Sequence, residues 1–147
     1  MLIDKAEIER RIPHAGAMNL LDGVVEWNAE TIRCRATSHR DPANPLRVAG
    51  KLYAISGVEY ASQAMAIHGA LSGSVAERPR AGYLASLRDV MCHRAMLDSE
   101  ADELSVFAES LMGDDTRVMY AFSVSAGAEE IITGRATVVL DISNLTT

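Results

Sequence analysis

The arrangement of hydrophobic and polar positions changes several times along the chain, and these changes divide the chain into elements. After a short amphipathic start at residues 4–12, the segments 18–28 and 30–38 read as two strands with a turn between them, because apolar side chains recur at alternate positions. Residues 57 to about 71 are apolar on all sides, which indicates a buried helix. Four further runs of about ten residues alternate again and are divided by turn-forming residues: 82–93, 102–112, 116–126 and 129–141.

The buried helix decides the fold class. A helix of about 15 residues is roughly 22 Å long, and one that is apolar on all sides must be covered over most of its surface. We therefore predict an α+β fold in which a curved antiparallel sheet of five to six strands wraps one long central helix, with the four C-terminal runs paired in order as a meander. The inward face carries Val118, Tyr120, Phe122 and Val124 on one strand and Ile132, Gly134, Ala136, Val138 and Leu140 on the next. Because such pairing leaves an edge strand free, we expect the sheet to continue across a two-fold homodimer.

The start of the predicted helix carries two polar side chains one turn apart. Ser56 is the expected N-cap, and residues 72–74 are the expected end of the helix. Glu59 stands three residues after Ser56, which is the spacing of a capping box, and Gln63 follows Glu59 by four residues. The alternative is that Glu59 is a catalytic carboxylate, because its neighbours are apolar or small and the helix offers it no cation at i±4.

Length, charge and cysteine use exclude several classes of protein. We expect one domain over residues 1–147, with no membrane association, because no apolar run approaches the roughly 18 residues of a membrane span. A net charge of −6 argues against nucleic acid as a partner. The N-terminus is too charged for a secretory signal, so we expect a cytoplasmic protein with reduced cysteines. Neither Cys34, on the buried face of an alternating strand, nor Cys92 is placed to bind a metal, and we expect no cofactor.

Residues 39–53 are expected to form a loop, since they hold two of the four prolines and a glycine. Loops of this length within a compact domain are usually functional. Arg40 and Arg47 within it are candidates to receive an acidic carrier protein or a phosphate, while a solvated charged face is the alternative.

Two stretches of the sequence resemble a known family. The first is "IPHAGAMNLLD", in which Pro13 and His14 precede an apolar run, Leu20 and Leu21, that ends at Asp22. The second is "EYASQAMAIHG", in which Glu59 and Gln63 are followed by small residues. Both are similar to the 3-hydroxyacyl-ACP dehydratases of the FabZ type, which have the hotdog fold. Together with "HRDPANPLR" and "GYLASLRDV", they make the chain most similar to the divergent hotdog dehydratases of aryl-polyene-type biosynthetic clusters.

The resemblance implies a function and the partners that go with it. It implies a dehydratase of 3-hydroxyacyl thioesters in fatty-acid or polyene-type biosynthesis, acting on acyl-ACP or acyl-CoA. It also implies a homodimer, or a hetero-oligomer with another hotdog subunit. One motif of the family is missing, however. FabZ-type enzymes take their catalytic histidine from a Gly-His-Phe-Pro segment upstream of the glutamate, and here that place is occupied by "NPLR", with Pro45 near the histidine position.

Dehydration of such a thioester requires removal of an α-proton, polarisation of the carbonyl and protonation of the departing hydroxyl. Glu59, in the first turn of the helix, is the candidate general acid. Backbone N–H groups near Gly57 and Val58 are candidates to hold the thioester oxygen, since helix N-termini present unpaired donors. Gln63 is expected to orient Glu59 or the substrate hydroxyl.

The catalytic base has two candidates within the chain. His14 is the first, because the matching histidine of FabZ-type proteins lies close to the acyl tunnel. His39, at the start of the loop, is the second, since a histidine has an unperturbed pKa near the working pH. Arg47 is a candidate for substrate or carrier binding. His68, half a turn around the helix from Glu59, is expected to be structural.

Two other functions remain open. Some hotdog thioesterases use a helix carboxylate as nucleophile or base and need no histidine, so Glu59 also fits an acyl thioesterase. The chain would alternatively be a non-catalytic subunit that shapes or completes the site of a histidine-bearing hotdog partner.

Overall fold

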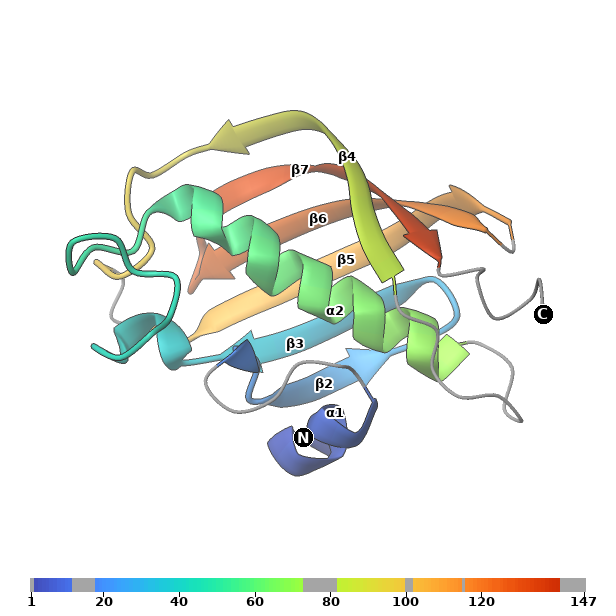
Figure 1. Cartoon of the computed structure of the whole chain (residues 1–147), viewed down its shortest axis with the longest axis horizontal. Helices are drawn as coiled ribbons and strands as arrows, with labels where there is room; N and C mark the ends of the chain where they lie inside the picture. Colours follow the sequence, from blue (N-terminus) through green and yellow to red (C-terminus); the bar gives the residue numbers. More distant parts are fainter. Residues whose placement is uncertain (1, 12–17, 73–81, 100–101, 115, 141–147) are drawn as a thin grey trace.

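The computed structural model describes residues 2–11, 18–72, 82–99, 102–114 and 116–140 (Figure 1). Its strands are β1 (Ile3–Asp4), β2 (Gly23–Trp27), β3 (Thr31–Ala36), β4 (Gly82–Cys92), β5 (Leu104–Gly113), β6 (Arg117–Ala126) and β7 (Glu129–Leu140). Its α-helices are α1 (Lys5–Arg11) and α2 (Gly57–Ser72), and two short 3-10 turns are η2 (Ser38–Arg40) and η3 (Ala54–Ser56). The predicted buried helix over 57–71 is therefore confirmed to within one residue.

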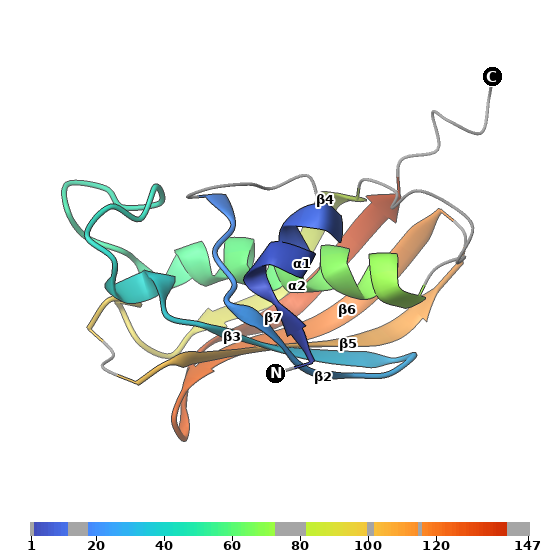
Figure 2. The same ribbon diagram turned by 90° about the horizontal axis from the view of Figure 1, so that it is seen from below.

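The strands form one antiparallel sheet in the order β1-β2-β3-β5-β6-β7-β4. It has seven strands among the described residues, rather than the five to six expected, and the addition is β1, in which Ile3 pairs with Val24. Two residues are too few to show an alternating pattern. The layout is that of the hotdog fold, with one long helix lying along the curved sheet (Figure 2).

The order of the strands corrects the predicted four-stranded meander. Of the four C-terminal strands, only β5, β6 and β7 are consecutive neighbours, while β4 lies at the far edge beside β7 and β3 pairs with β5 (Figure 1). Alternation specifies which face of a strand is buried, but a shift of neighbours leaves that pattern unchanged. The pairing of β4 with β7 is interrupted twice, between Leu84 and Ser86 and between Arg88 and Met91. Asp89, at the second interruption, has a positive φ of 55°.

The core lies between α2 and the concave face of the sheet. Of the residues predicted to face inward on β6 and β7, six are buried: Tyr120, Phe122, Val124, Ile132, Ala136 and Val138. Val118 and Gly134 are half-buried, and the side chain of Leu140 lies outside the described part of the chain. Gly57 begins α2 directly against this face, because a Cβ atom there would lie 2.6 Å from Cγ2 of Ile132. Only glycine lets the start of the helix approach the sheet this closely. The predicted placement of Cys34 on the buried face of β3 is also confirmed, and burial raises the pKa of its thiol to about 12.

The start of α2 differs from the predicted capping box. The chain enters the helix through η3, and the N–H of Ser56 donates to the carbonyl of Tyr53 at 3.0 Å. Ser56 is thus the last residue of a 3-10 turn and not an N-cap. The 3-10 bonds satisfy backbone groups that a side-chain cap would otherwise serve.

The described residues lack a membrane-spanning helix and a cluster of metal-binding side chains. No helix in the described part of the chain is long and apolar enough to cross a membrane. The same residues contain no group of three or more His, Cys, Asp or Glu side chains that could hold a metal ion.

Candidate active site at the start of the central helix

Glu59 occupies the first turn of α2 and is half-buried. Its Oε1 lies 3.3 Å from Nε2 of Gln63, the residue four positions along the helix, so Gln63 donates to the carboxylate. Ser62 donates to the Glu59 backbone carbonyl at 2.9 Å, and its Oγ lies 3.4 Å from Oε2 of the same residue. The carboxylate therefore has a defined orientation, set by its own helix.

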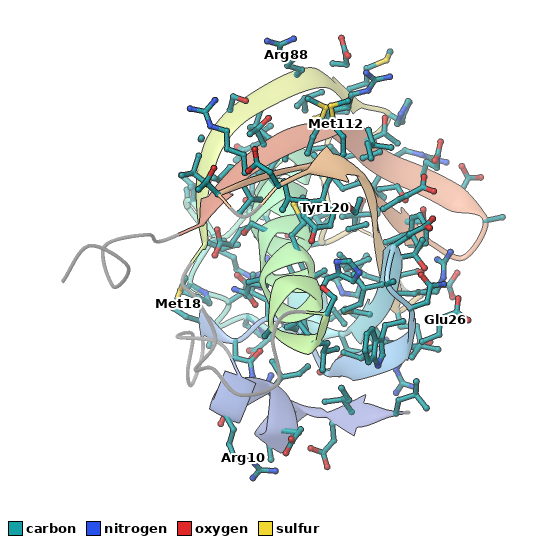
Figure 3. The ribbon with its side chains drawn as sticks, turned by 90° about the vertical axis from the view of Figure 1, so that its right-hand side faces the viewer. Arg10, Met18, Glu26, Arg88, Met112 and Tyr120 are labelled. Carbon is teal, nitrogen blue, oxygen red and sulfur yellow. The ribbon has the colours of Figure 1, made fainter. Side chains whose placement is uncertain are left out.

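Gln63 is fully buried and connects the helix to the segment before β2. Its Oε1 accepts the N–H of Leu20 at 3.0 Å, and its Nε2 donates to the carbonyl of Met18 at 2.7 Å. Because Oε1 faces an N–H donor, the Nε2 end must face both Met18 and Glu59. Figure 3 shows Met18 beside the central helix. The expectation that Gln63 orients Glu59 agrees with this geometry, and its two long-range bonds were not foreseen.

His14 lies outside the described residues, four positions before Met18 in the sequence. Its assignment as catalytic base stays a prediction. What the structure adds is that Met18, which resumes the described chain after it, is held against α2 by the same amide that contacts Glu59.

Sequence reasoning missed a polar cluster around the hydroxyl of Tyr60, the residue that follows Glu59 in the sequence. Tyr60 is fully buried, and its hydroxyl lies 2.8 Å from Oγ of Ser38 and 3.0 Å from Nδ2 of Asn44. Burial raises the pKa of Tyr60, and its hydrogen bonds with Ser38 and Asn44 oppose that rise only in part, so the hydroxyl stays protonated at neutral pH. The available signal was Tyr60 itself, a large amphipathic residue next to Glu59 in a helix start made mostly of small residues.

The loop at 39–53 is braced by Arg47. The guanidinium donates to the carbonyls of His39, Asp41 and Gly50 at 2.9 to 3.0 Å. It also forms a 2.7 Å ion pair with Asp98, whose carboxylate accepts the N–H of Leu52 at 3.3 Å. The substrate- or carrier-binding role of Arg47 stays a prediction, and the structure shows these bonds holding the loop in shape.

The two described histidines with buried side chains both bind backbone carbonyls. His39 lies in η2, and its Nε2 donates to Asp102 at 3.0 Å. His68 lies farther along α2, where Nε2 donates to the carbonyl of Asn28 at 2.9 Å and Nδ1 accepts the Tyr120 hydroxyl at 2.8 Å. Desolvation lowers the pKa of His68, so its ring is neutral at pH 7. The expected structural role of His68 agrees with these contacts.

The two predicted oxygen-binding residues differ in what their positions allow. Gly57 is buried against Ile132, and its N–H donates to the carbonyl of Ala54 within η3. Val58 follows it in the first turn of α2 and is half-buried. That these two amides hold a thioester oxygen stays a prediction.

Solved structures with similar folds include a dehydratase and several thioesterases. A chain of the dehydratase heterocomplex ApeI:P from Xenorhabdus doucetiae matches with a TM-score of 0.82 and 22% identity, covering 93% of this chain and 92% of that one. A mutant thioesterase from Pseudomonas aeruginosa matches with a TM-score of 0.68 and 11% identity, covering 95% of both chains. A hypothetical thioesterase with coenzyme A from Streptococcus pneumoniae matches with a TM-score of 0.59 and 11% identity, covering 80% of this chain and 84% of that one. At these identities the likenesses establish the hotdog fold.

Sequence comparison assigns the family. No curated protein matches the chain significantly. The family model for ApeP-like proteins, described as ApeP dehydratase, matches residues 6–146, which is nearly the whole chain. The chain therefore belongs to the ApeP-like family of dehydratases.

Proposed function

We propose that this protein is a dehydratase subunit that removes water from a 3-hydroxyacyl thioester, carried by an acyl carrier protein, in fatty-acid or polyene-type biosynthesis. The observation that carries the proposal is the alignment of Glu59 by the buried Gln63 in the first turn of α2. Glu59 is the general acid, a backbone N–H near Gly57 and Val58 holds the thioester oxygen, and His14 is the base within this chain.

The reaction assigns one step to each group. The base takes a proton from the carbon next to the thioester carbonyl, and the electron pair of that C–H bond forms the new C=C bond. The C–O bond at the next carbon breaks, and the oxygen leaves as water with the proton of Glu59. An N–H donor at the carbonyl oxygen stabilises the negative charge that develops there during proton removal. Each group acts only if it is positioned within hydrogen-bond reach of its target.

The subunit role follows from the free edge of the sheet. We propose that β4 is the surface that pairs with a second hotdog subunit, because it is an edge strand that exposes three large apolar side chains: Leu84, Leu87 and Met91. The solved dehydratase with a similar chain is a heterocomplex. A second copy of this chain would bring its own His14, and a paralogous partner that carries the Gly-His-Phe-Pro histidine is the alternative source of the base.

The test compares this chain alone and together with a second hotdog subunit that carries the Gly-His-Phe-Pro histidine, using a 3-hydroxyacyl thioester and following the absorbance of the conjugated enoyl product. We expect Glu59→Gln to abolish product formation while leaving the melting temperature nearly unchanged. Glu30→Gln, at an exposed carboxylate in the β2–β3 turn, is the matched control and should keep full activity. Full activity of Glu59→Gln would overturn the assignment of the general acid.

A thioesterase is the second candidate. It is supported by the place of Glu59 in the first turn of α2, beside a helix N-terminus, and by the similar folds of two solved thioesterases. A mechanism that needs only a carboxylate and a helix N-terminus fits that arrangement. The product discriminates, since hydrolysis releases a free thiol and dehydration leaves the thioester intact.

A further inference from the structure

We propose that Tyr60 is a positioning residue of the candidate site. Its hydroxyl acts through Ser38 on the backbone of Leu20, and Leu20 in turn sets the side-chain amide of Gln63, which contacts Glu59. The effect on catalysis rests on the proposed function, whereas the structural coupling does not.

The hydrogen bonds of Tyr60 run in one direction. Ser38 Oγ lies 2.8 Å from the carbonyl of Leu20, which can only accept, so the Ser38 proton is committed to that bond. The Tyr60 hydroxyl must then donate to Ser38 Oγ. Asn44 Nδ2 donates in turn to the Tyr60 oxygen and, with its other proton, to the carbonyl of Ser38 at 2.9 Å. Each proton has one assigned acceptor, and a chain of this kind is cooperative.

The same short segment is held from its other side by Gln63. Leu20 donates its N–H to Gln63 and accepts from Ser38 at its carbonyl, so both of its backbone groups are fixed. Tyr60 and Gln63 are three residues apart on α2 and therefore lie on adjacent positions of one helix face. Two side chains of α2 thus hold the backbone of Leu20, Gln63 directly and Tyr60 through Ser38. Gln63 is also the donor to Glu59.

Removal of the Tyr60 hydroxyl would break the hydrogen-bonded link between α2 and the Leu20 carbonyl. Ser38 would lose its donor and Asn44 one acceptor in a buried place, and both would reorient to find new partners. The Leu20 carbonyl would then be held less firmly, and the Gln63 amide would lose the geometry that points Nε2 at Glu59. Displacements of about 1 Å in a catalytic group cost up to roughly a hundredfold in rate.

Tyr120 offers a matched control for Tyr60. It is also buried and also donates its hydroxyl to a polar side chain, but its partner is His68, beyond the site on α2. We expect Tyr60→Phe and Tyr120→Phe to lower the melting temperature by similar amounts. Only Tyr60→Phe is expected to lower kcat, by about tenfold or more, with KM nearly unchanged.

A second readout does not depend on activity. The Leu20 amide should be protected from hydrogen exchange in the wild type, and we expect Tyr60→Phe to speed its exchange by about tenfold more than Tyr120→Phe does. Ser38→Ala, which cuts the chain one bond further along, should reproduce the exchange and the kcat of Tyr60→Phe, and it replaces that variant if Phe at this position does not fold.

The two proposals fail in different ways. If the wild type shows no dehydration with any hotdog partner, the proposed function fails and the exchange of Leu20 alone decides the coupling. If the wild type is active but Tyr60→Phe and Ser38→Ala keep its kcat and its Leu20 protection, the positioning role is wrong. Equal loss of kcat in Tyr120→Phe would also overturn it, because the effect would then be one of general stability.

Discussion

Alanine substitutions at Gly57 and Gly69, two glycines of α2, should change the free energy of unfolding in opposite directions. An added Cβ at Gly57 would lie 2.6 Å from Cγ2 of Ile132 and 3.5 Å from Cγ2 of Val124. At Gly69, by contrast, an added Cβ would meet no heavy atom within 4 Å. The same chemical change therefore tests packing at one end of α2 and helix propensity at the other.

The magnitudes follow from these distances. Carbon atoms in contact sit at about 3.5–4.0 Å, so Gly57→Ala forces the helix start and the sheet apart by about 1 Å. Overpacking of this kind costs about 1–3 kcal/mol, and alanine recovers about 0.5–1 kcal/mol of helix propensity. We expect a net loss of about 1–2 kcal/mol. Gly69→Ala has only the propensity gain and should stabilise the protein by about 0.5–1 kcal/mol.

Urea denaturation of the two variants beside the wild type measures both free energies of unfolding. The double variant Gly57→Ala with Ile132→Ala tests whether Ile132 causes the loss. Once Cγ2 of Ile132 is removed, Gly57→Ala should lower the free energy of unfolding by less than it does in the wild type. Equal stability of Gly57→Ala and the wild type would refute the reasoning, as would shifts of the same sign at both glycines.

Further predictions concern pH and the loop. The pKa of His68 is lowered in the folded state, so its contribution to the free energy of unfolding is complete above about pH 6.5 and is lost as the pH falls toward the folded-state pKa, by at most about 1.4 kcal/mol per pH unit. Thermal melts between pH 5 and pH 7 should show a shallower dependence in His68→Gln, and an unchanged slope would contradict this. Arg47→Ala leaves the Asp98 carboxylate without its cation and should cost about 2–4 kcal/mol in urea denaturation. Arg88→Ala, at an exposed arginine, should stay within about 0.5 kcal/mol, and equal effects would argue against the bracing role.

The elements of the fold were predictable because each is encoded locally. Apolar positions around the helix and alternation along the strands reflect burial, and burial is what packing selects. The order of strands was not predictable in the same way, since β4 alternates identically whether it lies beside β5 or β7. The predicted capping box at the start of α2 was wrong because it, too, depends on the residues outside the pattern. Ser56 and Glu59 have the spacing of a capping box, but the preceding 3-10 turn had already satisfied the backbone.

In the candidate site, contacts within one element were likewise predictable from the sequence, and contacts between distant segments were not. The contact between Glu59 and Gln63 spans four residues of one helix, so the sequence pattern could indicate it. The bonds from Gln63 to Met18 and Leu20 join residues 45 and 43 positions apart. The partners of Tyr60 likewise come from a turn and a loop distant in the sequence. Spacing rules describe neighbours within an element, and they carry no information about which segments the fold brings together.

The two edges of the sheet have a consequence for aggregation. An edge strand is a template on which further chains can add without limit, and short length and bulges are the usual protection. Here one edge is β1, which is only two residues long, and the other is β4, whose pairing shifts register twice and whose Asp89 takes a left-handed conformation. A strand that pairs with β4 must match an interrupted row of donors and acceptors. The irregularities of β4 therefore allow pairing with a partner strand of matching shape, and they disfavour the repeated strand addition that builds a fibril.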